Sequence, residues 1–467
     1  MTSPTPLTAA PDLAEPTPGF AGSIGVARRD ITPPPGIFIR VWGPATEDVS
    51  TGTHRPLTLT ALALVADGQD PLVLLAADLG WWQDPADEWH VRGSVLERLG
   101  LDSARVLLSL SHTHAGPSTY RGDAGQPGGH LIPPYLDALR DAAVGAAEEA
   151  LARCVEATLT WTTGRSGVAG NRDLPRDDRY VVGYNPAAHA DDTLLVGRVT
   201  GADGAVIATL VNYACHPTTL AWQNTLVSPD FAGALREVVE DGTDGAPCLF
   251  LQGASGDLAP REQYVGDTAV ADRHGTALGH AALGALCAMP AAGTELACLG
   301  VVESGAPLAI WGLRTVAQPR SARASHHDVP VALKDDLPTI EELEVAWADI
   351  DPLSRVERIR RARNLRASYS DDGAATHPLW VWSLGDCAIV GQPGELYSAF
   401  QERLRARFPE RAVVVLNVTN APGAVYLPPE HLYDENIYPV WQTLLARGSM
   451  ERVLDAAVTD LDERAGP

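Results

Sequence analysis

The sequence is poor in positive charge. Among its 467 residues, 35 lysines and arginines stand against 59 aspartates and glutamates, which gives a formal net charge of −24 at pH 7. Lys334 is the only lysine, a bias that we attribute to codon usage rather than to chemistry. Nucleic acids and anionic membranes both attract basic proteins, so the charge balance argues against nucleic acid and against an anionic membrane as partners.

Long apolar runs are missing as well. None is long enough to cross a bilayer, so we expect no stable membrane insertion. Residues 1–20 are rich in Pro, Thr and Ala and lack a basic start followed by an apolar stretch, which predicts a disordered N-terminal tail and not a signal peptide. The six cysteines form no C-x-x-C pair, which favours buried free thiols. Together these absences predict a cytoplasmic protein.

The motifs of nucleotide-binding enzymes and of serine hydrolases are also absent. The sequence has no P-loop, no G-x-G-x-x-G placed after a strand and no G-x-S-x-G elbow. Its composition is that of an ordinary globular protein, with 45% hydrophobic and 20% charged residues, which predicts a substantial core. No interface patch stands out, so the oligomeric state is left open.

Several segments share one plan, in which an apolar strand leads into a short polar or glycine-containing cluster. The predicted strands are 72–77, 105–110, 206–213, 248–251, 388–390 and 413–418. The predicted helices are 134–153, 230–240, 267–288, 339–366, 396–408 and 437–463. Continuous apolar strands are buried on both faces, so we predict an α/β fold with a mixed β-sheet core covered by helices. A functional site is expected at the carboxyl ends of the strands.

No internal repeat or low-complexity linker divides the chain, so residues 21–467 are predicted to form a single domain. The stretch 306–376 interrupts the alternation of strands and helices. It contains an acidic run at 335–344 and a basic helix around 355–366. We interpret this stretch as a lid or an insertion over the sheet.

The His112-Thr113-His114 motif is the first chemical signal, because it ends a buried strand. In an extended strand residues i and i+2 share a face, so the motif predicts two imidazoles side by side. Neutral imidazole suits Zn²⁺, and a catalytic zinc needs about three protein ligands and an open position. For this motif alone, a hydrogen-bonded histidine pair at a strand end is an equal alternative.

Two further strand ends add candidate ligands. His216 follows a buried strand and stands before Pro217, which stops that strand. Glu395 follows a Gln-Pro-Gly turn and opens a predicted helix. Each has a structural alternative, a capping histidine for the first and a carboxylate that stabilises a helix N-terminus for the second. Together with His112 they strengthen the case for a metal site.

Other residues at strand ends have two interpretations each. Asp78 would orient a metal ligand or form part of a turn. Trp81 and Trp82 would wall a substrate site or pack in the core. His326 and His327 lie in the proposed insertion and are expected to be solvated.

Short sequence stretches spread along the chain match one known family. They are 30–34 (D-I-T-P-P), 112–117 (H-T-H-A-G-P), 216–218 (H-P-T), 256–260 (G-D-L-A-P), 392–395 (Q-P-G-E) and 426–430 (Y-L-P-P-E). In this order, and over roughly residues 22–440, they resemble the neutral ceramidase family, also called neutral/alkaline non-lysosomal ceramidases.

The resemblance implies a catalytic zinc ion as the cofactor. In the family its ligands are the first His of H-T-H-x-G-P, the His of H-P-T, the Glu of P-G-E and a late Tyr. The matching metal ligands on this chain are His112, His216, Glu395 and Tyr426. A tyrosine ligand must lose its phenolic proton, which the metal promotes.

The resemblance also implies catalytic residues around the metal. His114 would face the substrate and handle the proton of the departing amine. Asp257 would orient a metal-bound histidine. Arg172 would stabilise developing negative charge, with an ordinary surface arginine as the alternative.

These residues predict a zinc-dependent hydrolase that cleaves a linear amide (N-acyl) bond of a small or lipid-like substrate by a metal-activated water. Two features depart from the family. Ala259 stands where ceramidases carry an active-site serine, and the chain stops soon after the Tyr426 stretch, where the family continues into an immunoglobulin-like domain. Both departures favour a smaller and more soluble amide than ceramide.

Two alternatives stay open for the function. A zinc-dependent tailoring enzyme of small-molecule biosynthesis would use the same fold and metal for cyclisation or another non-hydrolytic Lewis-acid step. A binding or scaffold protein with a degenerate site would need no chemistry. The joint presence of His112, His216 and Glu395 argues against the second alternative.

Overall fold

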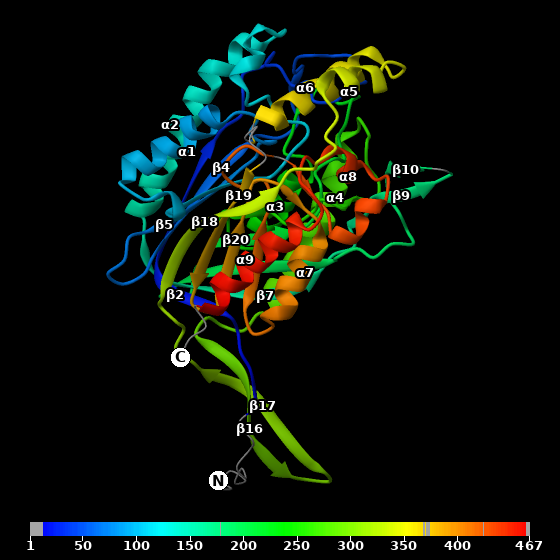
Figure 1. Ribbon diagram of the computed structural model, residues 1–467. Helices are drawn as coiled ribbons and strands as arrows, with labels where there is room; N and C mark the ends of the chain where they lie inside the picture. Colours follow the sequence, from blue (N-terminus) through cyan, green and yellow to red (C-terminus); the bar gives the residue numbers. More distant parts are fainter. Residues whose placement is uncertain (1–12, 178, 368, 370–373, 424, 464–467) are drawn as a thin grey trace.

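Two β-sheets stacked face to face form the centre of the computed structural model (Figure 1). The structure describes residues 13–177, 179–367, 369, 374–423 and 425–463. Helices cover the outer faces of the sheets. The fold is therefore α/β with mixed sheets, as predicted, although two main sheets take the place of the single one expected.

The larger sheet has eight strands. In spatial order they are β14 (Cys248–Gln252), β12 (Val206–Tyr213), β11 (Thr193–Gly201), β7 (Val155–Arg165), β2 (Gly19–Asp30), β4 (Thr58–Val65), β5 (Leu72–Ala77) and β6 (Val106–Leu110). β5 and β6 run parallel, as do β12 and β14. The other neighbouring pairs are antiparallel, so the sheet is mixed.

The smaller sheet has four strands. In spatial order they are β18 (Ala322–Ala332), β19 (Ala374–Leu384), β20 (Cys387–Gly391) and β22 (Ala412–Leu416). β20 and β22 run parallel, and the other pairs are antiparallel. All six predicted strands are found, with bounds within two residues of the prediction.

The apolar strands are buried because the two sheets pack on each other. Phe20 and Leu62 of the larger sheet lie in one apolar cluster with Trp380, Trp382 and Ile389 of the smaller sheet. An apolar strand pattern indicates burial on both faces without distinguishing a covering helix from a second sheet. This is why the sequence predicted one sheet.

Helices cover both sheets from outside. They are α1 (Pro85–Leu99), α2 (Ile132–Ala152), α3 (Phe231–Asp241), α4 (Thr268–Ala288), α5 (Ile340–Ala346), α6 (Pro352–Ala367), α7 (Ser398–Arg407), α8 (Tyr438–Gln442) and α9 (Ser449–Glu463). α1 and α2 pack on one half of the larger sheet, and α3 and α4 pack on the other half. α7 and α9 pack on the smaller sheet.

The sequence prediction misses α1. Its ends carry the usual signals, since the Asp84 side chain accepts a hydrogen bond from the first turn and Gly100 ends the helix with a φ of 65°. Its buried face, however, carries Glu88 and Arg92, which form an ion pair. These charges hide the apolar periodicity by which a helix is recognised.

Two predicted helices are each divided in two. The stretch 339–366 forms α5 and α6, and α6 begins at Pro352, which lacks the backbone N–H needed to continue a helix. The stretch 437–463 forms α8 and α9, and the turn between them contains Gly448 with a φ of 85°.

Part of the predicted tail forms strands in the described residues. β1 (Ala14–Glu15) pairs with β16 (Thr294–Glu303), and β2 starts at Gly19. The prediction of disorder is therefore wrong for residues 13–20, and residues 1–12 lie outside the described residues. The strand that pairs with β1 is distant in the sequence, so no local pattern predicts this pairing.

The predicted lid at 306–376 is not one structural unit. β17 (Pro307–Thr315) forms a hairpin with β16 that projects from the body, whereas β18 belongs to the smaller sheet (Figure 1). α5 and α6 lie at the end of the molecule opposite this hairpin (Figure 1).

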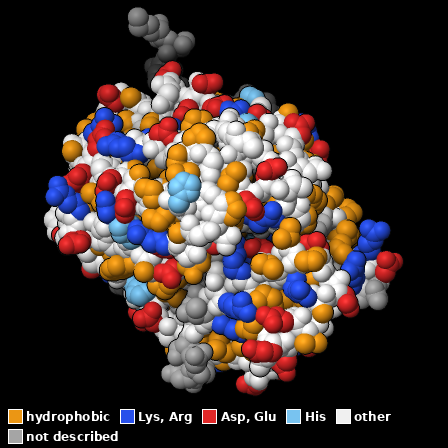
Figure 2. Space-filling model, turned by 90° about the horizontal axis from the view of Figure 1, so that it is seen from above, with side chains coloured by type: hydrophobic (Ala, Val, Ile, Leu, Met, Phe, Trp, Pro, Cys, Tyr) orange, Lys and Arg blue, Asp and Glu red, His pale blue; other side chains and the backbone are white. Residues whose placement is uncertain are grey.

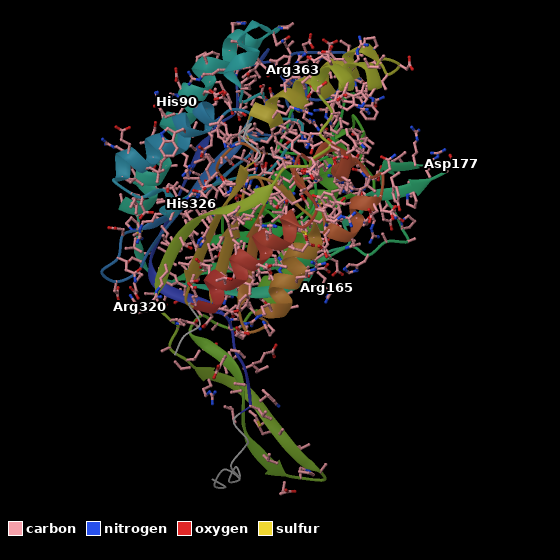
Figure 3. All side chains as sticks on the ribbon, in the orientation of Figure 1. His90, Arg165, Asp177, Arg320, His326 and Arg363 are labelled. Carbon is pink, nitrogen blue, oxygen red and sulfur yellow. The ribbon has the colours of Figure 1, made fainter. Side chains whose placement is uncertain are left out.

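His326 and His327, which were expected to be solvated, are half-buried and packed in the fold. His326 lies on β18 (Figure 3), and its ring centroid is 4.7 Å from that of Trp380. His327 Nε2 lies 2.6 Å from a carboxylate oxygen of Asp460 in α9. Packing between β18, β19 and α9 accounts for both residues.

Short strand pairs complete the fold. They are β3 (Gly52–Thr53) with β13 (Leu226–Val227), β8 (Ala169–Asn171) with β15 (Leu258–Pro260), β9 (Asp173–Arg176) with β10 (Arg179–Val182), and β21 (Glu395–Leu396) with β23 (Tyr426–Leu427). Within the described ranges, every helix is too short or too polar to span a bilayer. On the face seen in Figure 2, basic side chains are scattered among acidic and apolar ones.

Candidate metal centre

The strongest candidate ligands meet where strand ends converge. β6 and β14 are the two edge strands of the larger sheet, yet they contact each other. The Asn420 side chain, from the loop after β22, makes two hydrogen bonds to the backbone of β6, at 2.7 and 3.2 Å. The carboxyl ends of β6, β12 and β20 thereby lie close together, and His112, His216 and Glu395 follow these ends.

The side chains of these residues form a small triangle of donor atoms. His112 Nε2 lies 3.1 Å from His216 Nε2, and Glu395 Oε2 lies 3.1 Å from His216 Nε2 and 3.6 Å from His112 Nε2. Donors bound at about 2.0–2.1 Å to one tetrahedral zinc ion are about 3.3–3.4 Å apart. The triangle therefore has the size that a single zinc ion needs.

A hydrogen bond on the far side of each imidazole defines where its hydrogen lies. His112 Nδ1 lies 3.1 Å from the Gly80 carbonyl oxygen, and His216 Nδ1 lies 3.0 Å from the Ser255 carbonyl oxygen. A carbonyl only accepts, so each Nδ1 carries the hydrogen and each Nε2 directs a lone pair into the triangle. Glu395 Oε2 is buried and accepts no hydrogen bond within the described residues. Such a set of facing lone pairs fits a bound cation.

The electrostatics of the triangle keep its members in their metal-binding forms. Burial lowers the pKa of His216 to about 3, so this imidazole is neutral. For Glu395, burial raises the pKa of the carboxyl, whereas a charge on His112 or His216 lowers it well below its ordinary value. Neutral imidazole and ionised carboxylate are the forms that bind a metal.

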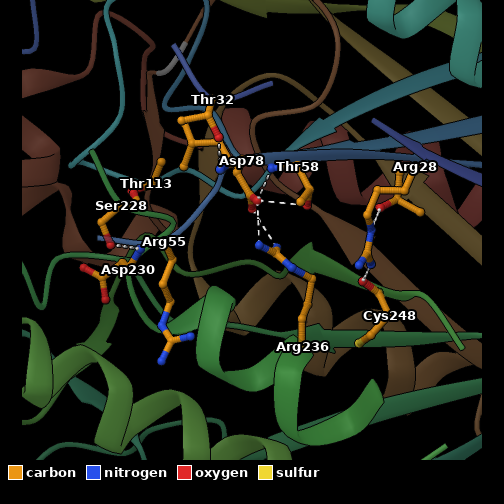
Figure 4. A network of polar contacts seen from close by, with 12 residues as sticks. Arg28, Thr32, Arg55, Thr58, Asp78, Thr113, Ser228, Asp230, Arg236 and Cys248 are labelled. Atoms are coloured by element: carbon orange, nitrogen blue, oxygen red, sulfur yellow. Dashed lines mark hydrogen bonds and ion pairs between the residues drawn. The ribbon is translucent and has the colours of Figure 1, made fainter. Parts of the chain in front are cut away.

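The His-Thr-His motif reaches this geometry in a way that the sequence does not predict. β6 ends at Leu110, and His112 has a φ of 65°, in the left-handed region that non-glycine residues rarely adopt. The rings of His112 and His114 are inclined by 78° with centroids 4.8 Å apart, so they do not lie side by side on a strand face. Thr113 Oγ1 donates a hydrogen bond to the Ser228 carbonyl oxygen at 2.7 Å, which anchors this turn. Figure 4 includes both of these residues.

His114 lies beside the triangle among aromatic rings. Its ring centroid is 5.4 Å from that of Trp42 and 5.1 Å from that of Trp81. Burial lowers the pKa of His114 well below its ordinary value, and its buried Nε2 has no hydrogen-bond partner in the described part of the chain. Ring nitrogens of His112, His114 and His216 lie within 4.8 Å of one another, so these three histidines could also hold a metal ion together.

Tyr426 and Arg172 form the wall next to Glu395. Glu395 and Tyr426 are register partners in the parallel pair β21–β23, so one short sheet presents both residues. Arg172 Nη2 donates to Tyr426 Oη at 2.8 Å and to the Gly256 carbonyl oxygen at 2.8 Å. Burial raises the pKa of Tyr426 well above its ordinary value, and the charge of Arg172 acts in the opposite direction. Arg172 is 3% exposed, so it is not a surface arginine.

Asp257 does not make the contact predicted for it. Its two carboxylate oxygens accept hydrogen bonds from Ser398 N and Ser398 Oγ, each at 2.7 Å, at the start of α7. The Nδ1 atoms of His112 and His216 have backbone carbonyls as partners instead. Burial raises the pKa of Asp257 to about 6. Asp257 in the Gly-Asp turn therefore stabilises the start of α7. This is a structural role that Asp residues in turns commonly have.

Asp78 likewise stabilises the fold beneath the site and does not contact a histidine. It accepts hydrogen bonds from Thr58 N at 2.8 Å and from Arg236 Nη1 and Nη2 at 2.8 and 2.6 Å (Figure 4). This buried ion pair connects the end of β5 to α3. Asp78 also stands two residues before Gly80, whose carbonyl orients His112.

The triangle faces a cavity of about 180 Å³. Six of the predicted site residues line it, namely His112, His114, Arg172, His216, Glu395 and Tyr426. Trp81 and Trp82 line it too, and both also pack in the apolar cluster under α1 and α2, whereas Ala259 is not among the lining residues. Trp42 and the part of α6 that contains Arg361 also line the cavity, and neither was predicted from the sequence. The basic character of α6 is visible in the sequence, but its place over the site is not.

The comparisons with known proteins agree with this architecture. No model of a protein family matches the sequence, and a search of curated proteins finds no match. A ceramidase complexed with C2 superposes with a TM-score of 0.67 at 16% identity, over 96% of this chain and 76% of its own. A neutral ceramidase from Pseudomonas aeruginosa superposes with a TM-score of 0.68 at 18% identity, over 96% of this chain and 75% of its own. The protein therefore has the fold of the neutral ceramidases, as the short motifs indicated.

Proposed function

We propose that this protein is a zinc-dependent hydrolase of linear amide bonds. The observation that carries the proposal is the triangle of His112 Nε2, His216 Nε2 and Glu395 Oε2, with separations of 3.1, 3.1 and 3.6 Å. Tyr426 is the candidate fourth ligand, because it is paired in register with Glu395. We assign His114, beside the triangle, to the substrate and not to the zinc.

A bound zinc ion supplies Lewis-acid polarisation of the scissile carbonyl and acidifies water. The chain supplies positioning and proton transfer. His114 has a lowered pKa and an Nε2 without a hydrogen-bond partner in the described residues, so it is suited to accept a proton from the attacking water and to pass that proton to the departing nitrogen. Arg172 holds its charge next to Tyr426 and stabilises negative charge on the acyl oxygen. In the overall reaction the acyl carbon gains the oxygen of water, and the nitrogen leaves with a proton.

The class and size of the substrate rest on separate observations. The amide class is supported by the neighbours in fold, which are named as ceramidases, and by the motifs shared with that family. The volume of about 180 Å³ beside the triangle favours a small group next to the scissile bond. Drug-sized ligands occupy pockets of roughly 300–1,000 Å³. A small N-acyl compound is therefore the proposed substrate.

Metal analysis of the purified protein tests the site. We expect about one zinc per chain, lost in His112→Ala and in Glu395→Ala because each removes a ligand. His114→Ala should keep the zinc and lose roughly 10²- to 10⁴-fold in kcat, as expected for a proton-transfer residue. His326→Ala is the matched control, since its ring packs on Trp380 and does not line the cavity.

Hydrolysis is tested with a panel of N-acyl amino acids, fatty-acyl amides and ceramides, by the release of free amine. Turnover that survives in both His112→Ala and Glu395→Ala would refute the proposed site. Bound zinc without cleavage of any amide in the panel would favour the tailoring enzyme. A protein that binds no zinc after reloading would exclude both.

A further inference from the structure

Arg361 contributes a charge to the cavity that the proposed chemistry does not use. It belongs to the basic segment around 355–366, and α6 places it in the lining of the cavity next to the triangle. We propose that Arg361 binds a carboxylate of the substrate, so that the amide cleaved is that of an N-acyl amino acid. This inference rests on the proposed hydrolase function and adds the chemical class of the amine half.

Arg361 lies close to the candidate ligands. Its guanidinium carbon is 5.9 Å from the centroid of the Trp81 ring, and that ring is 5.7 Å from the ring of His112. It donates a hydrogen bond to the hydroxyl of Tyr438, whose ring centroid is 5.4 Å from that of Tyr426. One small molecule would therefore be long enough to bind Arg361 through a carboxylate and to reach the triangle with its amide group.

No carboxylate within the described ranges forms an ion pair with Arg361. Tyr438 and the charges of Glu357 and Glu395 nevertheless act on it and raise its pKa. The neighbouring Arg360 uses the nearby acids, because it bonds both oxygens of Asp123 at 2.9 Å and pairs with Glu357 at 2.9 Å. Arg361 forms no ion pair among the described residues, and its hydrogen-bond partner there is the Tyr438 hydroxyl. The charged residues that line the cavity are Arg172, Arg360, Arg361, Glu357 and Glu395. Arg360 is thus balanced by Asp123 and Glu357, which leaves Arg172 and Arg361 in the lining without an ion pair among the described residues.

A part-buried guanidinium without a counter-ion favours an anionic ligand. Partial desolvation raises the cost of an unpaired charge, and the planar fork of arginine matches the two oxygens of a carboxylate. The net charge of −24 repels anions at long range. Exposed charges are, however, screened beyond about 8 Å at physiological ionic strength. Inside the cavity the two guanidiniums without ion pairs, Arg172 and Arg361, attract an anion.

The side chain of the amino acid in the proposed substrate has space beyond Arg361. A second cavity of about 360 Å³ adjoins the first, and Arg361 and Tyr438 line both. Its walls include Leu343, Trp347 and Trp441, and the guanidinium of Arg358 lies over both tryptophan rings, so they offer apolar surface next to a positive charge. The side chain of the substrate's amino acid would enter this second cavity. The substrates that fit are N-acyl derivatives of apolar amino acids.

The test compares molecules that differ only in the carboxylate. N-acetyl-leucine carries it, and N-(3-methylbutyl)acetamide has a hydrogen in its place. Binding is measured apart from turnover with uncleavable isosteres of both compounds, in which a CH₂ group replaces the amide N–H. Isothermal titration calorimetry gives the dissociation constant of each isostere. Arg361→Gln removes the charge, and Arg361→Lys keeps the charge without the fork. Arg363→Gln is the matched control, because Arg363 is exposed on α6 (Figure 3) and pairs with Glu344 at 3.0 Å.

In the wild type, the isostere with the carboxylate should bind at least about tenfold more tightly than the one without it. Arg361→Gln should abolish this preference, Arg361→Lys should keep part of it, and Arg363→Gln should keep all of it. In turnover, the kcat/KM ratio of the two amides should fall by about 10- to 100-fold in Arg361→Gln, through KM.

Equal binding of both isosteres to the wild type, or an unchanged preference in Arg361→Gln, would overturn the carboxylate site. No binding of the acidic isostere to the wild type would overturn it as well. A preserved binding preference without cleavage of any amide would instead refute the hydrolase and support the carboxylate site.

Discussion

The buried ion pair between Asp78 and Arg236 leads to a quantitative prediction for the fold beneath the site (Figure 4). Two guanidinium nitrogens of Arg236 lie 2.8 and 2.6 Å from the two carboxylate oxygens of Asp78, and the side chains are 8% and 2% exposed. Thr58 adds hydrogen bonds to Asp78 at 2.8 and 3.1 Å. Arg236→Met would leave a buried carboxylate with Thr58 as its remaining partner among the described residues.

The magnitude follows from the uncompensated charge. Removing one partner of a buried ion pair costs about 3–5 kcal/mol, because the other charge stays in a medium that solvates it poorly. We expect Arg236→Met to lower the free energy of unfolding by this amount, and Asp78→Asn to do the same by leaving the guanidinium unpaired. The double variant buries no charge at this place, so its loss should be smaller than the sum of the single losses by at least about 1 kcal/mol.

Urea unfolding, followed by tryptophan fluorescence and far-UV circular dichroism, measures these free energies. Arg98→Met is the matched control, because its ion pair with Glu148 is exposed and should be worth less than about 1 kcal/mol. If the free energy of unfolding lost in the double variant equals the sum of the losses in the two single variants, the coupling of the two charges is refuted. A loss below about 1 kcal/mol for Arg236→Met would refute the reasoning from buried charge.

Three further predictions concern the site and its supports. Zinc at about 100 times its dissociation constant should raise the free energy of unfolding by about 2.7 kcal/mol, seen as a chelator-sensitive shift in urea unfolding that His112→Ala should lack. Thr113→Val removes the hydroxyl that bonds the Ser228 carbonyl at 2.7 Å and should cost about 1–3 kcal/mol in the same assay; a loss near zero would show that another contact anchors the turn. Burial raises the pKa of Asp257 from 3.8 to about 6, so the folded state holds this proton more tightly than the unfolded state. Relative to Asp257→Asn, the wild type should therefore lose up to about 3 kcal/mol of stability as the pH rises from about 4 to about 7, and parallel pH profiles would contradict the raised pKa.

The outline of the fold could be predicted from the sequence because apolar strands and capped helices are local patterns. The strands β5 and β12 have the bounds that their apolar runs indicate. The helix α1 was missed because the ion pair of Glu88 and Arg92 lies on its buried face, where periodicity requires apolar residues. The second sheet was missed because its apolar strands have the same local pattern whether a helix or a sheet covers them.

The candidate site was predicted in its residues and not in its geometry. The short motifs indicated His112, His216 and Glu395, and the structure brings their donor atoms within 3.6 Å of one another. The strand argument for the His-Thr-His motif was wrong, because His112 adopts a positive φ after the strand has ended. The predicted contact of Asp257 was wrong as well, because Ser398 at the start of α7 donates both hydrogen bonds to its carboxylate and the two imidazoles bond backbone carbonyls instead.

The sequence by itself determined six of the strands in the two main sheets, most of the helices and the residue types that a zinc site needs, because each of these depends on residues a few positions apart. The strands β2, β4, β7, β11, β18 and β19 of these sheets were not predicted. Only the tertiary structure decided which strand ends meet, since that depends on the packing of two sheets and on the contact between the edge strands β6 and β14. It also decided that Gly80 and Ser255 orient the two imidazoles, and that α6 places Arg361 over the cavity. These contacts join segments far apart in the chain, and no local pattern of residues encodes them.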